Sequence, residues 1–335
     1  MSPAGRPKGE SLARSAEEIP MTSTERLRHA LPWLLLAAAL AFPWIAGALD
    51  QSFYIGVVRR ILIFAIAATS LNFILGYGGM VSLGHAAFFG VGAYTVGALA
   101  MEGIGSAWIA WPLAVAVAAL AAVAIGAISL RTRGVYFIMI TLAFAQMVYY
   151  VAVGLKRYGG EDGLNLPARS GVGFGVDLGN DVAFYYVVLA LLVAVLVAFD
   201  RMLDARFGRA LIGIRENEAR MESLGFPTFR FRLAAFAIAG AVAGLAGALF
   251  ANHNLFVSPA VLHWTQSATF VVMVILGGIG YRYGGVLGAL VLLLLEEILA
   301  AYTEHWHLPL GVLLLAVVFL APRGLSGWLD ERRAR

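Results

Sequence analysis

The sequence predicts an all-α, polytopic membrane protein of about ten transmembrane or partly membrane-embedded helices. Of its 335 residues, 61% are hydrophobic and 13% are charged, which is about half the charged share of an ordinary soluble domain. The mean hydropathy is +0.82. The apolar residues gather into successive runs, most of which approach the roughly 20 residues that a helix needs to cross a bilayer.

The chain contains no cysteine. This excludes disulfides, thiolate nucleophiles, iron–sulfur clusters and cysteine-based zinc sites. The isoelectric point of about 9.4 is compatible with nucleic-acid binding, but the basic residues are spread over many loops instead of forming one patch. Membrane topology explains their placement better, and no nucleic acid is expected as a partner.

Taken in order, residues 1–28 are polar without apolar periodicity and predict a disordered tail. Residues 31–49 form the first apolar segment; signal-peptide cleavage is the alternative, but the segment approaches spanning length. The membrane domain is expected at residues 29–324 and a basic tail at 325–335. The other predicted spans are 55–75, 86–101, 108–130, 135–155, 182–199, 233–251, 266–279, 286–302 and 308–321.

The basic residues predict the orientation. If the amino terminus lies inside and the spans alternate, 19 of the 24 Lys and Arg fall in inner segments and 5 in outer ones. Lys and Arg concentrate on the cytoplasmic side of multi-pass proteins. Both termini are therefore expected in the cytoplasm, together with residues 200–232, whereas residues 156–181 form the longest outer loop.

Residues 200–232, here named the charged loop, carry 7 of the 24 basic residues and must lie in water. An apolar stripe nevertheless follows helical spacing within the loop, and Gly225 with Pro227 supplies a stop. The stripe residues are Phe207, Leu211, Ile214, Met221 and Leu224. The pattern predicts one or two amphipathic helices that dock on a soluble partner, with a helix flat on the membrane as the alternative.

Several kinds of chemistry are missing from the sequence. No glycine-rich loop with a phosphate-binding lysine is present, since the only lysines are Lys8 and Lys156, so any ATP and magnesium belong to another polypeptide. The stretch 304–307 lacks the spacing of a zinc motif. Ser82 and His85 resemble a nucleophile and a base, but a helix cap and a polar anchor are the preferred interpretation. No catalytic or metal site is predicted.

Ionisable residues within spans need partners. Glu296 and Glu297 lie at a depth comparable with Arg59 and Arg60, which predicts structural ion pairs; proton coupling through a carboxylate is the alternative.

Glycines mark close helix packing at Gly240 and Gly244. Two glycine-rich breaks, residues 74–79 and 275–285, resemble each other. They indicate either a duplicated pair of broken helices at a substrate path or a chance similarity.

A family resemblance rests on four ordered stretches of the sequence. These are Leu71-Asn72-Phe73 with Gly76-Tyr77-Gly78-Gly79, Ser82 to Phe88, Gly159-Gly160 with Gly163-Leu164, and Gly208-Arg209-Ala210 with Ile214 to Glu218. Together they resemble the LivM-type permease subunit of branched-chain amino-acid ABC importers. The resemblance implies import of leucine, isoleucine or valine through a bacterial-type cytoplasmic (inner) membrane by alternating access. It also implies a homologous second permease subunit, two ABC ATPase subunits, an extracytoplasmic solute-binding protein and membrane lipid as partners.

The resemblance gives the charged loop the role of a coupling-helix loop. Its ATPase-docking residues would be Phe207, Leu211, Ile214, Arg215, Glu216, Met221, Leu224 and Gly225, with the apolar ones as anchors and Arg215 and Glu216 at the rim. Binding-protein docking is expected at Gly160, Asp162 and Leu164. The substrate path is expected at Asn72, Thr141, Gln146 and Thr269, with helix–helix hydrogen bonds as the alternative. Rival functions are import of urea or another small solute, ion-coupled secondary transport through Glu296 or Glu297, and an intramembrane enzyme.

Overall fold

The computed structural model describes residues 36–47, 53–173, 177–302, 305, 307–320 and 324–331. The chain divides into two compact units, Met1–Phe42 and Pro43–Arg335. The described residues of the first unit start at Leu36, which is the first residue of the apolar helix Leu36–Gly47. The predicted disordered tail, residues 1–28, lies outside the described residues.

The second unit is a helix bundle, which confirms the predicted all-α polytopic class. Its helices are α2 (Phe53–Asn72), α3 (His85–Met101), α4 (Ala107–Ser129), α5 (Val135–Gly154), α6 (Asp181–Asp204), α7 (Arg206–Glu216), α8 (Glu218–Ser223), α9 (Thr228–Asn254), α10 (Trp264–Gly277), α11 (Gly284–Tyr302), α12 (His307–Leu320) and α13 (Gly324–Glu331). A π-helix, η1 (Phe73–Tyr77), continues α2, and two short 3₁₀ turns follow at η2 (Lys156–Tyr158) and η3 (Pro259–Leu262). Strands β1 (Leu164–Asn165) and β2 (Phe256–Val257) pair antiparallel.

Six helical segments of the described chain are long and apolar enough to cross a membrane. They are Phe53–Tyr77, Ala107–Ser129, Val135–Gly154, Asp181–Asp204, Thr228–Asn254 and Gly284–Tyr302. Helix α6 continues to Asp204 and α9 begins at Thr228, so both helices extend into the two ends of the charged loop. The basic tail expected at residues 325–335 contains most of α13, whose Ser326 Oγ donates to the Gly277 carbonyl of α10 at 2.5 Å.

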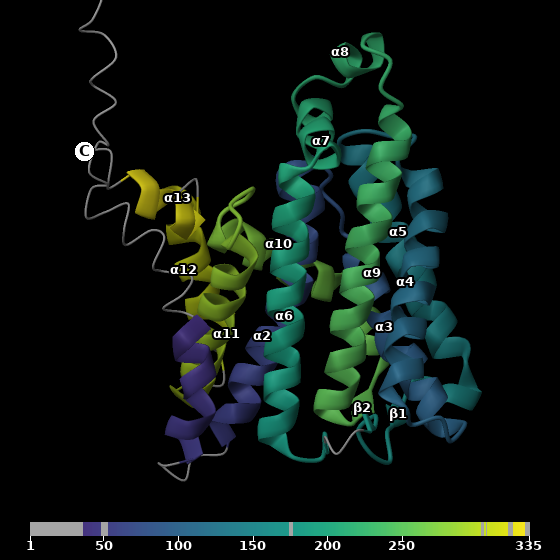
Figure 1. The fold of residues 1–335 in the computed structure, drawn as a ribbon, viewed down its shortest axis with the longest axis vertical. Coiled ribbons are helices and arrows are strands. Elements are labelled where there is room, and N and C mark those ends of the chain that lie inside the picture. The colour runs from purple at the N-terminus through teal and green to yellow at the C-terminus, as the bar shows by residue number, and fades with distance from the viewer. Residues whose placement is uncertain are drawn as a thin grey trace, which may run out of the picture. The chain divides into compact units, whose positions relative to one another are not determined.

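Helices α2 and α9 lie inside the bundle, and every residue of α2 and η1 from 61 to 76 is buried. Small residues let α3, α4 and α9 approach closely (Figure 1). A Cβ atom at Gly244 would lie 2.3 Å from the Ala118 Cβ, and one at Gly247 would lie 1.8 Å from the Phe89 carbonyl oxygen. Since neither distance is physically possible, these positions require glycine.

Helices α3 and α10 are shorter than a bilayer is thick, and both begin inside the bundle. The His85 Nε2, at the start of α3, lies 2.7 Å from the Ser70 Oγ in the buried part of α2. The Ala86 amide donates to the Ser267 Oγ in the first turn of α10 at 2.8 Å. The starts of the two short helices therefore meet, which is the geometry of partly embedded helices.

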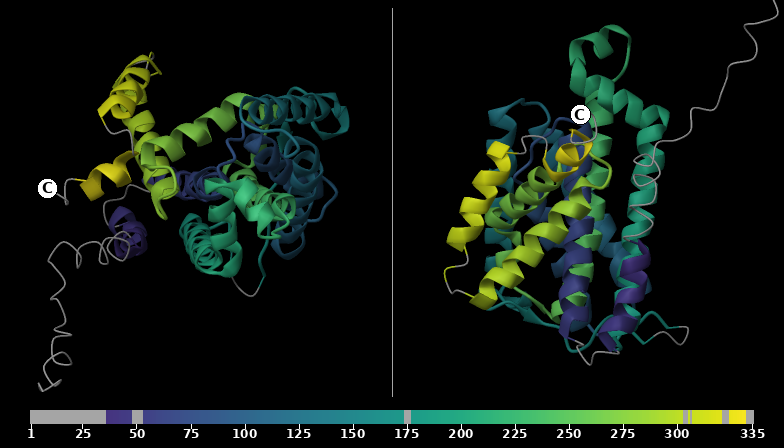
Figure 2. Two further views of the ribbon diagram at one scale, coloured as in Figure 1. Left: turned by 90° about the horizontal axis from the view of Figure 1, so that it is seen from above. Right: turned by 90° about the vertical axis from the view of Figure 1, so that its left-hand side faces the viewer.

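The bundle has two distinct ends. Helices α7 and α8 project at one of them, and the paired strands β1 and β2 lie at the other (Figures 1 and 2). We name these the loop end and the strand end. The connection between α4 and α5 belongs to the loop end, because Arg133 forms an ion pair with Glu218 of α8 at 3.3 Å.

Candidate functional site

The charged loop folds into two short helices with a defined turn between them. Helix α7 starts directly after α6, and Asn217 separates it from α8. The Asn217 side-chain oxygen accepts the Arg220 amide at 2.9 Å and so caps α8. Gly225 takes a φ of +83°, a left-handed conformation that glycine adopts without strain. The chain can therefore turn back from α8 into α9.

The apolar stripe of α7 is covered by the chain itself. Leu211 is 0% exposed and Ile214 is 4% exposed, while Phe207 stacks on Phe231 of α9 with ring centroids 5.6 Å apart. Leu211 and Ile214 have no surface left for a partner, so the expectation that they anchor an ATPase is corrected. Their spacing correctly predicts a helix with an apolar face, but spacing does not tell which molecule covers that face.

We expect Leu211→Ala to destabilise the folded chain by about 2–5 kcal/mol, because it leaves a cavity under α7. Thermal unfolding of the purified protein in detergent measures this loss. Leu224→Ala is the matched control, since Leu224 is 66% exposed, and it should leave the unfolding temperature nearly unchanged. Equal unfolding temperatures for the two variants would contradict the burial of the stripe.

The surface that the loop does offer lies beyond α7. Leu224, Phe226 and Phe229 are 66%, 39% and 38% exposed, and no residue of α8 is buried. We name these three residues the tip surface. Met221 is half-buried, whereas Glu216 is exposed. Exposed apolar groups on a projecting, otherwise charged loop are typical of a protein-binding surface.

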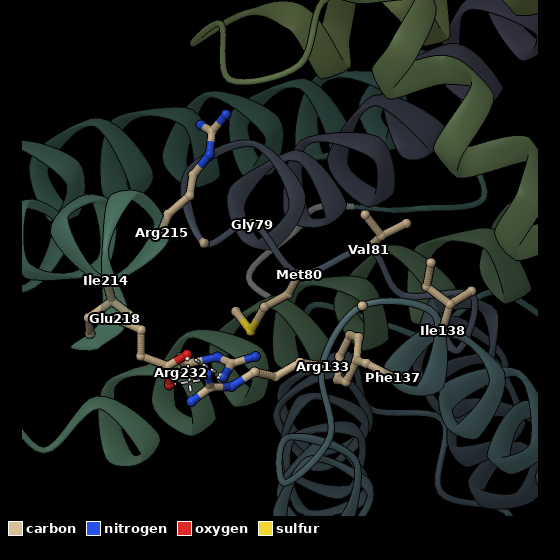
Figure 3. A pocket seen from close by; sticks show the side chains of 12 residues that line it. Gly79, Met80, Val81, Arg133, Phe137, Ile138, Ile214, Arg215, Glu218 and Arg232 are labelled. Atoms are coloured by element: carbon tan, nitrogen blue, oxygen red, sulfur yellow. Dashed lines mark hydrogen bonds and ion pairs between the residues drawn. The ribbon is translucent and has the colours of Figure 1, made fainter. Parts of the chain in front are cut away.

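A cavity of about 220 Å³ separates the charged loop from the start of α5. It is lined by Gly78, Gly79, Met80, Val81, Arg133, Gly134, Phe137, Ile138, Ile214, Arg215, Glu218 and Arg232. Its charges largely satisfy one another, because Glu218 pairs with Arg133 at 3.3 Å and with Arg232 at 3.2 Å (Figure 3). The Arg215 side chain points away from this group. It donates instead to the Gly76 carbonyl. Arg215 is nevertheless exposed, so its rim position stays a prediction.

Three of the four expected path residues serve the chain's own hydrogen bonding. Thr269 Oγ1 donates to the Thr265 carbonyl of its own helix at 3.1 Å, and Asn72 and Thr141 bond to other segments. Asn72 Nδ2 donates to the Tyr281 carbonyl at 2.8 Å, and Asn72 Oδ1 accepts the Gly280 amide at 3.0 Å. Thr141 Oγ1 donates to the Ile138 carbonyl at 2.9 Å and accepts the Leu83 amide at 3.3 Å. For both residues the structure matches the alternative of internal hydrogen bonds.

Gln146 and Thr269 are half-buried and lie on α5 and α10, two helices in contact with each other. Further polar groups accompany them that the sequence analysis did not single out. The rings of Tyr149 and His263 are 5.4 Å apart, and the His263 Nδ1 lies 3.0 Å from the Thr265 Oγ1. We name Gln146, Tyr149, His263, Thr265, Gln266 and Thr269 the polar strip. Gln266 Nε2 is buried without a hydrogen-bond partner in the described chain, which is costly in an apolar setting.

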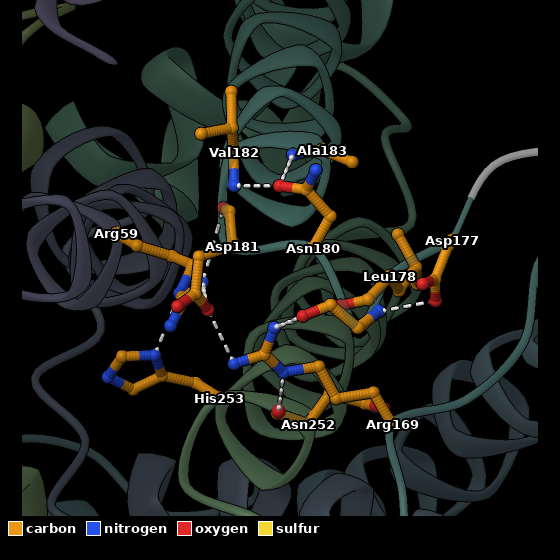
Figure 4. Close-up of polar contacts among 11 residues, drawn as sticks. Arg59, Arg169, Asp177, Leu178, Asn180, Asp181, Val182, Ala183, Asn252 and His253 are labelled. Carbon is orange, nitrogen blue, oxygen red and sulfur yellow. Dashed lines mark hydrogen bonds and ion pairs between the residues drawn. The ribbon is translucent and has the colours of Figure 1, made fainter. Parts of the chain in front are cut away.

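An ion network closes the strand end (Figure 4). Arg59, only 4% exposed, donates to the Asp181 Oδ1 at 2.7 Å and to the His253 Nδ1 at 2.9 Å. Arg169 donates to the same Asp181 oxygen at 2.7 Å, and both guanidinium groups lie over the Phe184 ring. Asp181 therefore neutralises two cations and joins α2, α6 and residues 156–181.

The structure brings Arg60 and Glu296 together at 3.0 Å. It does not bring Arg59 to Glu297, so that part of the expectation is corrected. Glu297 is half-buried, and no ion-pair partner for it lies within the described residues. Asp181 was not predicted as the partner of Arg59, because the two residues are 122 positions apart and residue spacing gives no information over that separation.

The expected docking residues of the segment 156–181 differ in exposure. Leu164 pairs with Val257 in the two-stranded ladder and is 4% exposed, and Gly160 is buried as well. Leu164 is therefore an internal side chain, and the expectation that it docks a binding protein is corrected. Asp162 is exposed and stays a prediction.

Comparison with protein-family models matches residues 53–321 to the family described as "Branched-chain amino acid transport system / permease component". The match covers nearly all of the helix bundle. The chain belongs to this permease family. It is accordingly a multi-pass membrane transport subunit, as the resemblance implied.

Two curated members of the permease family are the high-affinity branched-chain amino acid transport system permease proteins LivM of Salmonella typhimurium and of Escherichia coli. They are 33% and 32% identical to the chain over 317 residues, which cover 87% of the chain and 73% of each relative. The corresponding permease protein LivH of Salmonella typhimurium is 25% identical over 283 residues, covering 79% of the chain and 91% of LivH. No solved structure matches the chain.

Within this permease, Ser82 and His85 are not placed as a nucleophile and a base. Ser82 Oγ accepts the Gly84 amide at 3.1 Å, whereas His85 is fully buried and faces Ser70. Gly84, not Ser82, occupies the cap position of α3. Both side chains thus stabilise the entry into α3.

Proposed function

We propose that the chain is the membrane-spanning permease subunit of an ATP-binding-cassette importer for leucine, isoleucine and valine. Separate ATPase subunits bind ATP together with magnesium and hydrolyse it. A homologous second permease subunit completes the pathway, which opens alternately to either side. The membrane is the cytoplasmic (inner) membrane of a bacterial-type cell, with both termini and the loop end in the cytoplasm.

The tip surface is the observation that supports this proposal most strongly. A permease with no phosphate-binding loop of its own needs a soluble ATPase, and the tip surface offers exposed Leu and aromatic side chains on the charged loop. The relatives named LivM and LivH are both permease proteins of one kind of transport system, which supports a second permease subunit. At the strand end, the exposed Asp162 is available to a solute-binding protein.

The polar strip is the proposed contribution of this chain to the solute path. Its side chains combine hydrogen-bond donors and acceptors with a partly exposed position on α5 and α10. A solute with an ammonium and a carboxylate group can exchange hydrogen bonds with such a strip. Asn72 and Thr141 support the path only by holding the adjoining backbone.

The test is reconstitution of the chain in liposomes with a second permease subunit, ATPase subunits and a solute-binding protein of a branched-chain amino acid transport system from the same organism. We expect uptake of labelled leucine, isoleucine and valine only when ATP is supplied on the side of the ATPases. ATP-dependent uptake of urea in place of these amino acids would keep the architecture and replace the solute.

Ion-coupled secondary transport is the second candidate, because Glu297 lacks an ion-pair partner among the described residues. In that case uptake would persist without ATPases and collapse with the proton or sodium gradient. Glu297→Gln would then shift the pH optimum of uptake. Under the main proposal, Glu297→Gln leaves the pH optimum unchanged.

A further inference from the structure

Arg215, near the end of α7, reaches from the charged loop to a helix break inside the bundle. Its Nη1 donates to the Gly76 carbonyl in η1. Its methylene chain passes over Gly79, where a Cβ atom would lie 3.0 Å from the Arg215 Cγ. The carbonyls at the end of a helix have no intrahelical partner, so the guanidinium group supplies a bond that the backbone of η1 lacks.

The Gly76 carbonyl belongs to a unit formed by both helix breaks. A Cβ atom at Gly76 would lie 2.5 Å from the Gly280 amide nitrogen, and one at Gly280 would lie 3.7 Å from the Arg215 Nη1. Asn72 joins the breaks a second time through its bonds to Gly280 and Tyr281. The two glycine-rich stretches that resemble each other in sequence therefore touch, and the guanidinium group lies beside both.

Each break contains a residue that can absorb a change in backbone angles. Gly79 has a φ of +67° and Gly280 a φ of +79°. Such positions are where helices hinge, since glycine crosses between left- and right-handed regions at low cost. The breaks lie at the end of α2 and between α10 and α11, so a shift here moves three helices of the bundle.

We propose that Arg215 is a positioning residue that transmits movement of the charged loop to the paired helix breaks. This proposal rests on the proposed function, because the ATPase bound to the tip surface is what moves the charged loop. Arginine suits this task, since its planar fork holds a fixed geometry that the single ammonium of lysine does not reproduce. Arg282 adds a second link, an exposed pair with Asp204 of α6 at 2.7 Å, which contributes little by itself.

The functional test compares Arg215→Met with Arg215→Lys and Arg209→Met in the reconstituted complex. Arg209 is the matched control, because it is an exposed arginine of the same helix. We expect Arg215→Met to keep ATPase co-purification and ATP hydrolysis within about twofold while solute uptake per ATP falls at least tenfold. Arg215→Lys should recover part of the uptake, and Arg209→Met should retain both activities. A parallel loss of co-purification and hydrolysis in Arg215→Met would overturn the proposal and make Arg215 a docking residue.

A distance measurement tests the same link without ATP. Because the chain has no cysteine, spin labels can be placed at Ala219→Cys in α8 and Ile279→Cys in the second break. We expect a narrow distance distribution with Arg215 present and a clearly broader one with Arg215→Met. An unchanged distribution would overturn the proposal. If the wild-type complex shows no ATP-driven uptake, the proposed function fails, while the distance distribution still decides the role of Arg215.

Discussion

Asp181→Ala is expected to lower the amount of folded protein in the membrane sharply. The substitution removes the carboxylate that neutralises Arg59 and Arg169 and leaves Arg59, only 4% exposed, as a buried cation. Loss of one partner of a fully buried ion pair costs on the order of 3–5 kcal/mol, and because the Asp181 side chain is 53% exposed, we expect the loss here to lie below that range. The remaining contacts of Arg59, to the His253 Nδ1 and the Asp181 carbonyl, do not carry a compensating negative charge. Thermal unfolding and the monodisperse fraction after detergent extraction measure the effect.

Asp162→Asn provides the control for Asp181, because it removes an exposed carboxylate from the same segment and should change stability by less than about 0.5 kcal/mol. A second variant separates loss of charge balance from loss of packing. Adding Arg59→Met to Asp181→Ala removes the buried cation and should restore part of the folded fraction. The network would be unimportant if Asp181→Ala unfolded at the wild-type temperature.

The combined substitution Leu224→Ala and Phe229→Ala is expected to abolish ATP-dependent uptake while the permease subunits still assemble. Both side chains are exposed on the tip surface, and apolar anchors at a protein interface contribute roughly 1–3 kcal/mol each when truncated. Two such losses weaken binding of the ATPase about thirtyfold or more. Co-purification of the ATPase with the permease pair is the direct measurement, and uptake follows from it.

A matched pair of variants exists at the strand end. Leu155 and Phe256 are 45% and 37% exposed, so Leu155→Ala with Phe256→Ala removes similar apolar area far from the charged loop. This control should leave ATPase co-purification intact. If the tip variants retain the ATPase as well, the tip surface is not the docking site and the charged loop acts as a helix at the membrane surface.

Much of the fold could be predicted from the sequence because lipid imposes a strong constraint on it. Apolar runs of spanning length correspond to helices, and the predicted span at 135–155 matches α5 (Val135–Gly154) within one residue. The helical spacing in the charged loop likewise located α7 and α8, with the stop at Gly225 after α8. Local signals of this kind depend on neighbouring residues alone, so a single sequence carries them fully.

The partners of individual side chains could not be predicted to the same degree. The sequence predicts that an ATPase covers the stripe on α7, whereas Leu211 is buried within the chain itself. Arg59 was assigned to the glutamates of α11, whereas it binds Asp181 at the start of α6. Both errors concern contacts between distant segments, for which spacing gives no information. The pair of Arg60 and Glu296 was predicted from the depth of both residues in the membrane. This depth can be estimated from the sequence, because it follows from the position of a residue within its apolar segment.

The π-helix η1 gives the segment Phe73–Tyr77 a constraint on length as well as on composition. A π-helical turn holds one residue more than the corresponding α-helical turn. Deleting a single residue here would either reduce η1 to an α-helical turn or rotate the residues that follow by about 100° with a shift of about 1.5 Å. In both cases the position of the Gly76 carbonyl relative to Gly280 would change, whereas Asn72, which precedes the segment, would keep its place. A one-residue gap in this segment is therefore expected to be more harmful than most substitutions within it.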